Sequence, residues 1–241
     1  FDGKVSVKDT NLTFNIAGKV DFAKDLNKFD IHGIVQNANL KPLGFAQNDV
    51  KLRSEINLDF QGNELDNWLG EAKFLHTIMQ YDKRQLGIDS LFVTSSLSAN
   101  SRNISLLSEF FNIDISGKFT PSRVIADVTR LSKEYTQYFF DKEQIRLDYY
   151  AQLPYADIAN KYNLDYKVTF KKSEPFFAYF YPDLYISHGT ELSGNLNIRN
   201  TAELSLAGTI DTLRHGNLVF YNNDLDFNTS KEATSPKILR S

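Results

Sequence analysis

Apolar and polar residues alternate along most of the chain. Between Leu12 and Phe22 the even positions are apolar and the odd positions mostly polar. In a β-strand this alternation sends the two kinds of side chain to opposite faces. The same pattern recurs in Lys4–Val7, Val50–Phe60, Phe111–Phe119, Ile145–Leu153, Tyr162–Phe170, Leu192–Ile198 and Leu204–Ile210. Asn, Asp and Gly separate these runs and mark turns, so the pattern predicts a mostly β, antiparallel architecture.

One stretch has the spacing of a helix instead. Thr120 and Pro121 suit the N-cap and the first helical position. Apolar residues then follow three or four positions apart, which predicts one helix near 121–140 with a single apolar face. That face consists of Val124, Val128, Leu131, Tyr135 and Phe139. A second, shorter helical turn is predicted within Tyr155–Tyr162, near Ala156–Ala159.

Four strands share a short unit that reads aliphatic, small, Gly, polar, apolar. The unit occurs at Ile16–Val20, Ile115–Phe119, Leu192–Leu196 and Leu206–Ile210. Its Gly has the same phase as the apolar residues, and Gly inside a strand usually marks a bend or a close approach. The unit is consistent with a long sheet that curves around its apolar side. It is equally consistent with the coiled sheets of a β-sandwich.

Composition narrows the function classes. The chain has 241 residues, of which 41% are hydrophobic and 24% charged, with a formal net charge of −3. Such a chain can bury a core, and it lacks the basic surplus typical of nucleic-acid binders. No stretch approaches about 18 uncharged apolar residues, the length of a membrane-spanning helix. Without cysteine, the sequence offers no disulfide, thiolate metal site or cysteine nucleophile.

The sequence contains little catalytic chemistry. The four histidines lie far apart at His32, His76, His188 and His215, with no other ligand at a metal-site spacing. No nucleophile elbow or phosphate-binding glycine loop occurs, and no pair of carboxylates stands out. We therefore predict that the chain is not an enzyme and has no catalytic residues, metal site or cofactor.

The aromatic content, 13%, is unusual. A dense cluster runs from Phe176 to Tyr181, too dense for one face of one strand. It is interpreted first as a plug of the core or a cover for an edge. The alternative is an apolar surface for a ligand, a partner or a membrane.

Three stretches resemble the TamB family, the large periplasmic translocation and assembly proteins of the AsmA-like group, in particular its Bacteroidetes-type members. The first is Gly70–Ala72 with Tyr81 and Leu86–Leu91. The second is Ser101–Phe110, continuing through Ile113–Phe119 into the helix. The third is Phe180–Gly194, with its Phe, Pro, apolar, Gly-Thr, Leu, Gly order. Together these stretches cover most of the span from residue 70 to 220.

The resemblance implies a long sheet folded into a taco-like trough with an apolar interior. It implies a parent chain that is anchored in the inner membrane and crosses the periplasm. It also implies a role in carrying phospholipid toward the outer membrane, or in assisting outer-membrane protein assembly. A barrel partner of the TamA or BamA kind would bind through other parts of that chain.

We accordingly expect residues 1–241 to be one segment of a larger repetitive β-trough, with a helical insert between 1–120 and 145–241. The alternatives are a structural or interaction scaffold without lipid and a β-sandwich adhesin module. The candidates for the lipid groove are taken from the apolar phase of the strands. They are Phe14, Ile16, Val20, Leu58, Phe60, Ile113, Ile115, Leu164, Tyr166, Val168, Leu196 and Leu206.

Overall fold

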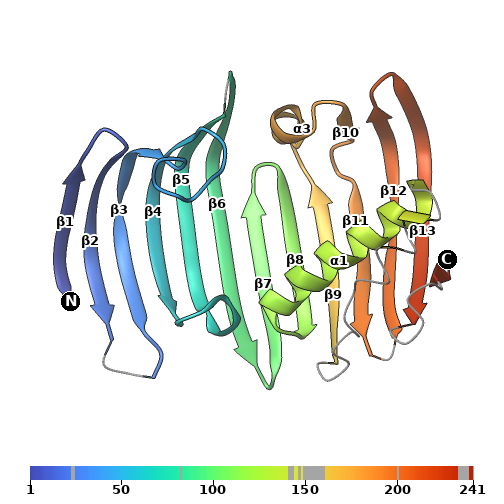
Figure 1. Cartoon of the computed structure of the whole chain (residues 1–241), viewed down its shortest axis with the longest axis horizontal. Helices are drawn as coiled ribbons and strands as arrows, with labels where there is room; N and C mark the ends of the chain where they lie inside the picture. The colour runs from blue at the N-terminus through green and yellow to red at the C-terminus, as the bar shows by residue number, and fades with distance from the viewer. Residues whose placement is uncertain are drawn as a thin grey trace.

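The computed structural model describes residues 1–22, 25–81, 83–140, 144–145, 148, 161–199, 201–232 and 239–240. They form one open, curled antiparallel sheet with two helices, as the alternating pattern predicts (Figure 1). The strands are β1 (Asp2–Lys8), β2 (Leu12–Asp21), β3 (Lys28–Asn39), β4 (Val50–Gln61), β5 (Leu69–Tyr81), β6 (Arg84–Ser98), β7 (Ser101–Ser108), β8 (Phe111–Lys118), β9 (Tyr162–Phe170), β10 (Leu184–Ile186), β11 (Glu191–Ile198), β12 (Thr201–His215), β13 (Leu218–Glu232) and β14 (Leu239–Arg240). The helices are α1 (Pro121–Phe140), α3 (Glu174–Phe180) and the 3-10 turn η1 (Leu65–Asn67).

Strand order in the sheet follows strand order in the chain almost throughout. The sheet runs from β1 to β9 in sequence and then through β11, β12, β13 and β14, while β10 pairs with β12 beside this path. Antiparallel pairing of β8 with β9 joins the strands that precede α1 to those that follow it. One sheet therefore passes through both halves of the chain.

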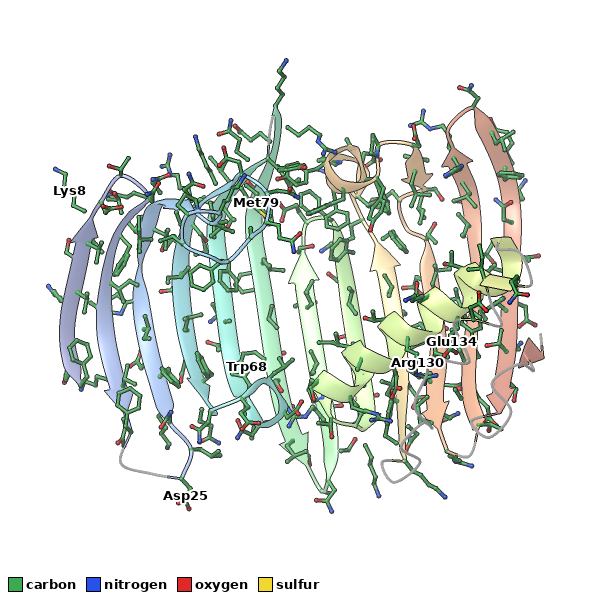
Figure 2. The ribbon with its side chains drawn as sticks, in the orientation of Figure 1. Lys8, Asp25, Trp68, Met79, Arg130 and Glu134 are labelled. Carbon is green, nitrogen blue, oxygen red and sulfur yellow. The ribbon has the colours of Figure 1, made fainter. Side chains whose placement is uncertain are left out.

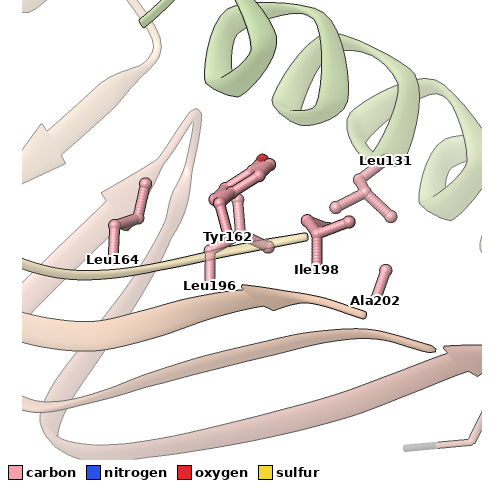
Figure 3. Close-up of a cluster of buried hydrophobic side chains, with 6 residues drawn as sticks. All are labelled: Leu131, Tyr162, Leu164, Leu196, Ile198 and Ala202. Carbon is pink, nitrogen blue, oxygen red and sulfur yellow. The ribbon is translucent and has the colours of Figure 1, made fainter. Parts of the chain in front are cut away.

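Helix α1 lies obliquely across one face of the sheet, over its C-terminal half (Figure 1). It starts at Pro121 and ends at Phe140, which confirms the predicted helix. Its Leu131 is buried against Leu196 and Ile198 in β11 and Tyr162 in β9, together with Leu164 and Ala202 (Figure 3). This is the principal apolar core of the molecule.

The predicted apolar face of α1 is partly wrong. Val128 is 50% exposed, whereas Asp127 and Glu134 are buried at 3% and 2%. Asp127 is buried because it receives hydrogen bonds from Arg123, Arg130 and the Tyr162 hydroxyl, which replace water around its carboxylate. Hydrophobic spacing alone could not reveal these polar partners.

Two other expectations concern the segment after α1. Ile145 is helical, so the strand predicted over Ile145–Leu153 is wrong at that residue. The helical turn predicted within Tyr155–Tyr162 lies outside the described residues except for Lys161, which is in no helix, and Tyr162, which begins β9. The aromatic cluster of residues 176–181 forms most of α3, where Phe177 and Tyr179 are buried, in agreement with the core-plug interpretation.

The sheet has a large surface for its mass. The accessible area of the whole chain is 15010 Å² for 27.6 kDa. The usual scaling for a folded monomer of that mass gives about 11,000 Å². The excess is the property expected of a sheet that a second layer covers only in part.

Candidate functional site

A single line of apolar residues crosses the sheet. Residues directly opposite each other in an antiparallel ladder share a face, so the register can be followed from strand to strand. From β1 to β13, omitting β10, one such line contains only apolar residues and glycine. This central row comprises Gly3, Gly18, Ile31, Leu58, Ala72, Val93, Leu106, Ile113, Val168, Leu192, Gly208 and Leu225. At the usual spacing between strands it is about 50 Å long.

A second row runs parallel to the first and is richer in aromatic residues. Its members are Val20, Phe29, Phe60, Gly70, Ser95, Ile104, Ile115, Tyr166, Gly194, Leu206 and Phe227. Ser95 is the one polar residue apart from the Tyr166 hydroxyl, and its hydroxyl donates to the Trp68 carbonyl at 2.9 Å. We call the side of the sheet on which both rows lie the apolar face.

All twelve groove candidates named from the sequence lie on the apolar face. Leu58, Ile113 and Val168 belong to the central row, and Val20, Phe60, Ile115, Tyr166 and Leu206 belong to the second. Phe14 and Ile16 pair opposite Val35 and Gly33 on the same side. Leu164 and Leu196 pair with each other, but they are only 3% and 2% exposed beneath α1. Those two are core residues here, and no ligand reaches them while α1 is in place.

The sequence reasoning missed the members of the face in β3, β5, β6 and β7. Phe29, Ile31, Val93 and Leu106 belong to the two rows and were not singled out. A regular alternation in Lys28–Val35 would have found the first two. In β5 and β6 the apolar phase changes within the strand, at His76, where φ is +48° and the ladder with β6 is interrupted. Because of this change, the apolar residues of β5 and β6 do not show one continuous alternation in the sequence.

The apolar face is open at its N-terminal end and covered at its C-terminal end. Of the side chains that β1 to β4 place on it, Ala38 and Ser54 are buried, and the others are half-buried or exposed. In the described part of the chain, neither helix packs on the faces of β1, β2 and β3. Under α1, by contrast, Tyr162, Ile198 and Ala202 are all buried.

Aromatic rings dominate one edge of the open part. Phe29 and Phe60 stack with ring centroids 4.6 Å apart, Phe22 meets Phe29 edge-on at 6.4 Å, and Trp68 lies 6.0 Å from Phe60. Phe22 is 66% exposed. These rings form an apolar surface that is still in contact with solvent. Trp68 lies at the lower end of the sheet in the view of Figure 2.

Glycines on the apolar face do not widen it. A Cβ on Gly194 would lie 1.9 Å from the Ser205 carbonyl oxygen and 2.7 Å from the Tyr166 hydroxyl. The Tyr166 side chain reaches over this position, because its hydroxyl donates to the same Ser205 oxygen at 2.6 Å. The glycine therefore provides room for a neighbouring ring and a close strand, rather than for a ligand.

Polar contacts fix α1 to the sheet at three points along its length. At its start, both carboxylate oxygens of Asp66 accept bonds from Ser122, at 2.7 Å from the backbone N–H and 2.6 Å from the hydroxyl. In the middle, the Tyr162 hydroxyl donates to Asp127 at 3.1 Å. Further along, the Tyr135 and Thr229 hydroxyls are hydrogen-bonded. Directional bonds, rather than apolar contact alone, determine where α1 lies.

Charged groups accompany these contacts. Arg130 bonds both Asp127, at 2.9 Å, and Glu134, at 3.3 Å, and the last two side chains are 4% and 2% exposed. Arg130 and Glu134 are labelled on α1 in Figure 2. Burial, with Asp127 beside it, raises the pKa of Tyr162 far above its usual range. The phenol therefore keeps its proton and donates to Asp127 at neutral pH.

Buried Arg102 supports the start of α1 from below. Its Nη1 donates to the Trp68 carbonyl and the Ser95 hydroxyl, each at 3.0 Å, and its Nη2 donates to the Asp66 carbonyl at 2.6 Å. Arg102 thus holds η1, whose Asp66 in turn holds Ser122. The Arg102 and Asp66 side chains together connect β7, the turn between β4 and β5, and the start of α1.

The described residues include no group of three His, Asp or Glu that could hold a metal ion. None of their helices is long and apolar enough to cross a membrane. Two hollows of about 570 and 500 Å³ lie on the polar face, between β2 and β6 and between β1 and β4, and both are lined by mixed charges. What the structure offers chemically is an extended surface for apolar contact.

Comparisons with known proteins identify no relative of this chain. No family model matches the chain, and no curated protein or solved structure is significantly similar to it. The resemblance to the TamB family therefore stays a prediction from the residues quoted for it.

Proposed function

We propose that this chain is a segment of a periplasmic envelope protein whose apolar face carries phospholipid toward the outer membrane, as the resemblance to the TamB family implies. The supporting observation is the central row, which is apolar in every strand it crosses. At about 50 Å it is several times longer than half of a bilayer core, about 15 Å. A fixed lipid pocket needs no such length, whereas a path along which acyl chains move does.

The energetics of the face also suit transport. Each methylene that leaves water gains about 0.8 kcal/mol, whichever part of the face it touches. Binding is therefore spread along the row without a single deep minimum, and a chain can shift by one strand at little cost. No covalent step is required. The open part, in β1 to β4, is where lipid would contact the sheet, while α1 covers the C-terminal half.

Copurified lipid provides the test, and β3 contains a matched control. Ile31 lies in the central row, and Ile34, which is 48% exposed, lies on the opposite face of the same strand. We expect Ile31→Asp to reduce about tenfold the amount of phospholipid that copurifies with the protein from a bacterial envelope, because a carboxylate in the row repels acyl chains. Ile34→Asp should leave it unchanged. Native mass spectrometry measures the lipid, and circular dichroism checks that both variants fold.

A lipid-free, folded wild-type protein would contradict the proposal, as would equal lipid loss from both variants. Such results would favour the second candidate function, a scaffold for outer-membrane protein assembly. One observation supports that candidate. Within the described residues, the outer edge of β13 is unpaired from Leu218 to Asn228, and Leu218–Tyr221 are all exposed there. An unpaired strand edge can accept another strand.

A further inference from the structure

A cavity of about 580 Å³ lies at the start of α1. It is open to solvent and is bordered by the turn between β6 and β7, the ends of β8 and β9, η1 and the first turns of the helix. It therefore lies beside the part of the apolar face that α1 covers. Most of its lining residues are polar, and Phe119 and Tyr162, which belong to the apolar cluster under α1, also line it.

Positive charge predominates in this cavity. Lys118, Arg123 and Lys161 line it together with the carboxylate of Asp66, whose two oxygens both accept bonds from Ser122. Arg123 is also paired with the buried Asp127 at 3.0 Å, so Lys118 and Lys161 supply the excess positive charge. Lys118 and Lys161 form no ion pair within the described part of the chain. The chain as a whole is acidic, with a net charge of −3, so this concentration of cations is local.

The larger hollow on the polar face shows the contrast. It is lined by Lys19 and Lys28, but also by four carboxylates, Asp21, Asp30, Asp59 and Glu71. That hollow would repel an anion, whereas the cavity at α1 would attract one. Lysine and arginine are the side chains that bind phosphate oxygens, and their attraction is strongest beside low-dielectric walls.

We propose that the cavity lined by Lys118, Arg123 and Lys161 binds the phosphate of an anionic phospholipid headgroup while the acyl chains lie on the apolar face. The site rests on the proposed function, because it assigns a polar subsite to the same lipid. An amphiphile needs a polar and an apolar environment within one molecular length. Phe119 lines the cavity and also packs against the apolar cluster under α1. The cavity gives the path a fixed position for the headgroup at the edge of α1.

The test compares two variants that change the net charge equally. Lys118→Glu/Lys161→Glu reverses two charges in the cavity, and Lys8→Glu/Lys51→Glu reverses two exposed charges in β1 and β4. The probes are dihexanoyl phosphatidylglycerol, the matched uncharged dihexanoylglycerol, and inorganic phosphate, each titrated by calorimetry. We expect wild type to bind the phosphatidylglycerol about tenfold more tightly than the uncharged lipid. The cavity variant should lose that ratio, and the control variant should keep it.

Three results would overturn the inference, and they differ from a failure of the proposed function. The ratio could persist in the cavity variant, it could fall equally in the control variant, or inorganic phosphate alone could bind as tightly as the lipid. The last result would assign the site to free phosphate. If the uncharged lipid binds to neither the wild type nor the two variants, the proposed function fails. The phosphate titration still reports whether the cavity binds an anion.

Discussion

Individual glycines on the apolar face permit the close approach of neighbouring strands. Gly117 has a φ of +144°, which L side chains rarely adopt, and a Cβ there would lie 2.3 Å from the Asn163 carbonyl oxygen. That oxygen belongs to the backbone of β9, which cannot move without distorting the sheet. Gly87 in β6 is different, since no atom lies within 4 Å of the corresponding Cβ position.

These two glycines give a prediction at the residue scale. Gly117→Ala should lower the free energy of unfolding by about 1–3 kcal/mol or more, because it combines overlap with a strained backbone. Gly87→Ala should change it by less than about 1 kcal/mol, because it fills empty space. Urea unfolding of both variants measures the difference. Equal effects would show that the approach of β8 and β9 does not depend on the glycine.

The sequence is informative at this scale where one physical effect dominates. The alternation in Leu12–Phe22 correctly predicted both the strand and its apolar side, and the phase of Gly117 correctly placed it on that side. The prediction from the sequence failed where an unusual backbone conformation or side-chain hydrogen bonds decide which residues are buried. The positive φ of His76 reverses the phase of β5, and hydrogen bonds bury Asp127 in α1 in place of Val128. Neither event leaves a trace in hydrophobic spacing.

Among the elements, α1 determines how much of the apolar face is open. Its sheet-facing side has one deeply buried aliphatic residue, Leu131, beside two buried carboxylates. Its outer side exposes Ile125 and Val128. A helix fixed by a few hydrogen bonds and one main apolar anchor is sensitive to the loss of that anchor.

The prediction for α1 compares two aliphatic residues on opposite sides of the helix. Leu131→Ala should cost about 2–5 kcal/mol, because it leaves a cavity beneath the helix. Ile125→Ala, at a residue 58% exposed, should cost less than about 1 kcal/mol. Thermal and urea unfolding monitored by circular dichroism measure both. A similar loss in the two variants would contradict the observed orientation of α1.

The molecule as a whole is a sheet of one layer at its N-terminal end and two layers where α1 lies. We expect the strands at the N-terminal end to open locally more easily than those beneath α1, because local opening is easiest where few apolar contacts are lost. We expect amide hydrogens of β9 and β11, beneath α1, to exchange slowest and those of β1 to exchange fastest. Hydrogen–deuterium exchange followed by mass spectrometry measures this order. Uniform protection across the sheet would mean that α1 adds no stability to the strands below it.

The order of the strands also has a consequence for how the chain folds. Nearly every strand pairs with the one made just before it, so the sheet can grow by adding hairpins in sequence, with little loss of chain entropy at each addition. The longest separation is that of Lys118 and Asn163, because α1 and the residues after it lie between them in the chain. A shorter one occurs where α3 and β10 separate β9 from its partner β11. We expect the longer closure, of β8 with β9, to be the slowest event of assembly. Until it occurs, the chain consists of two growing sheets whose edges at β8 and β9 are both exposed.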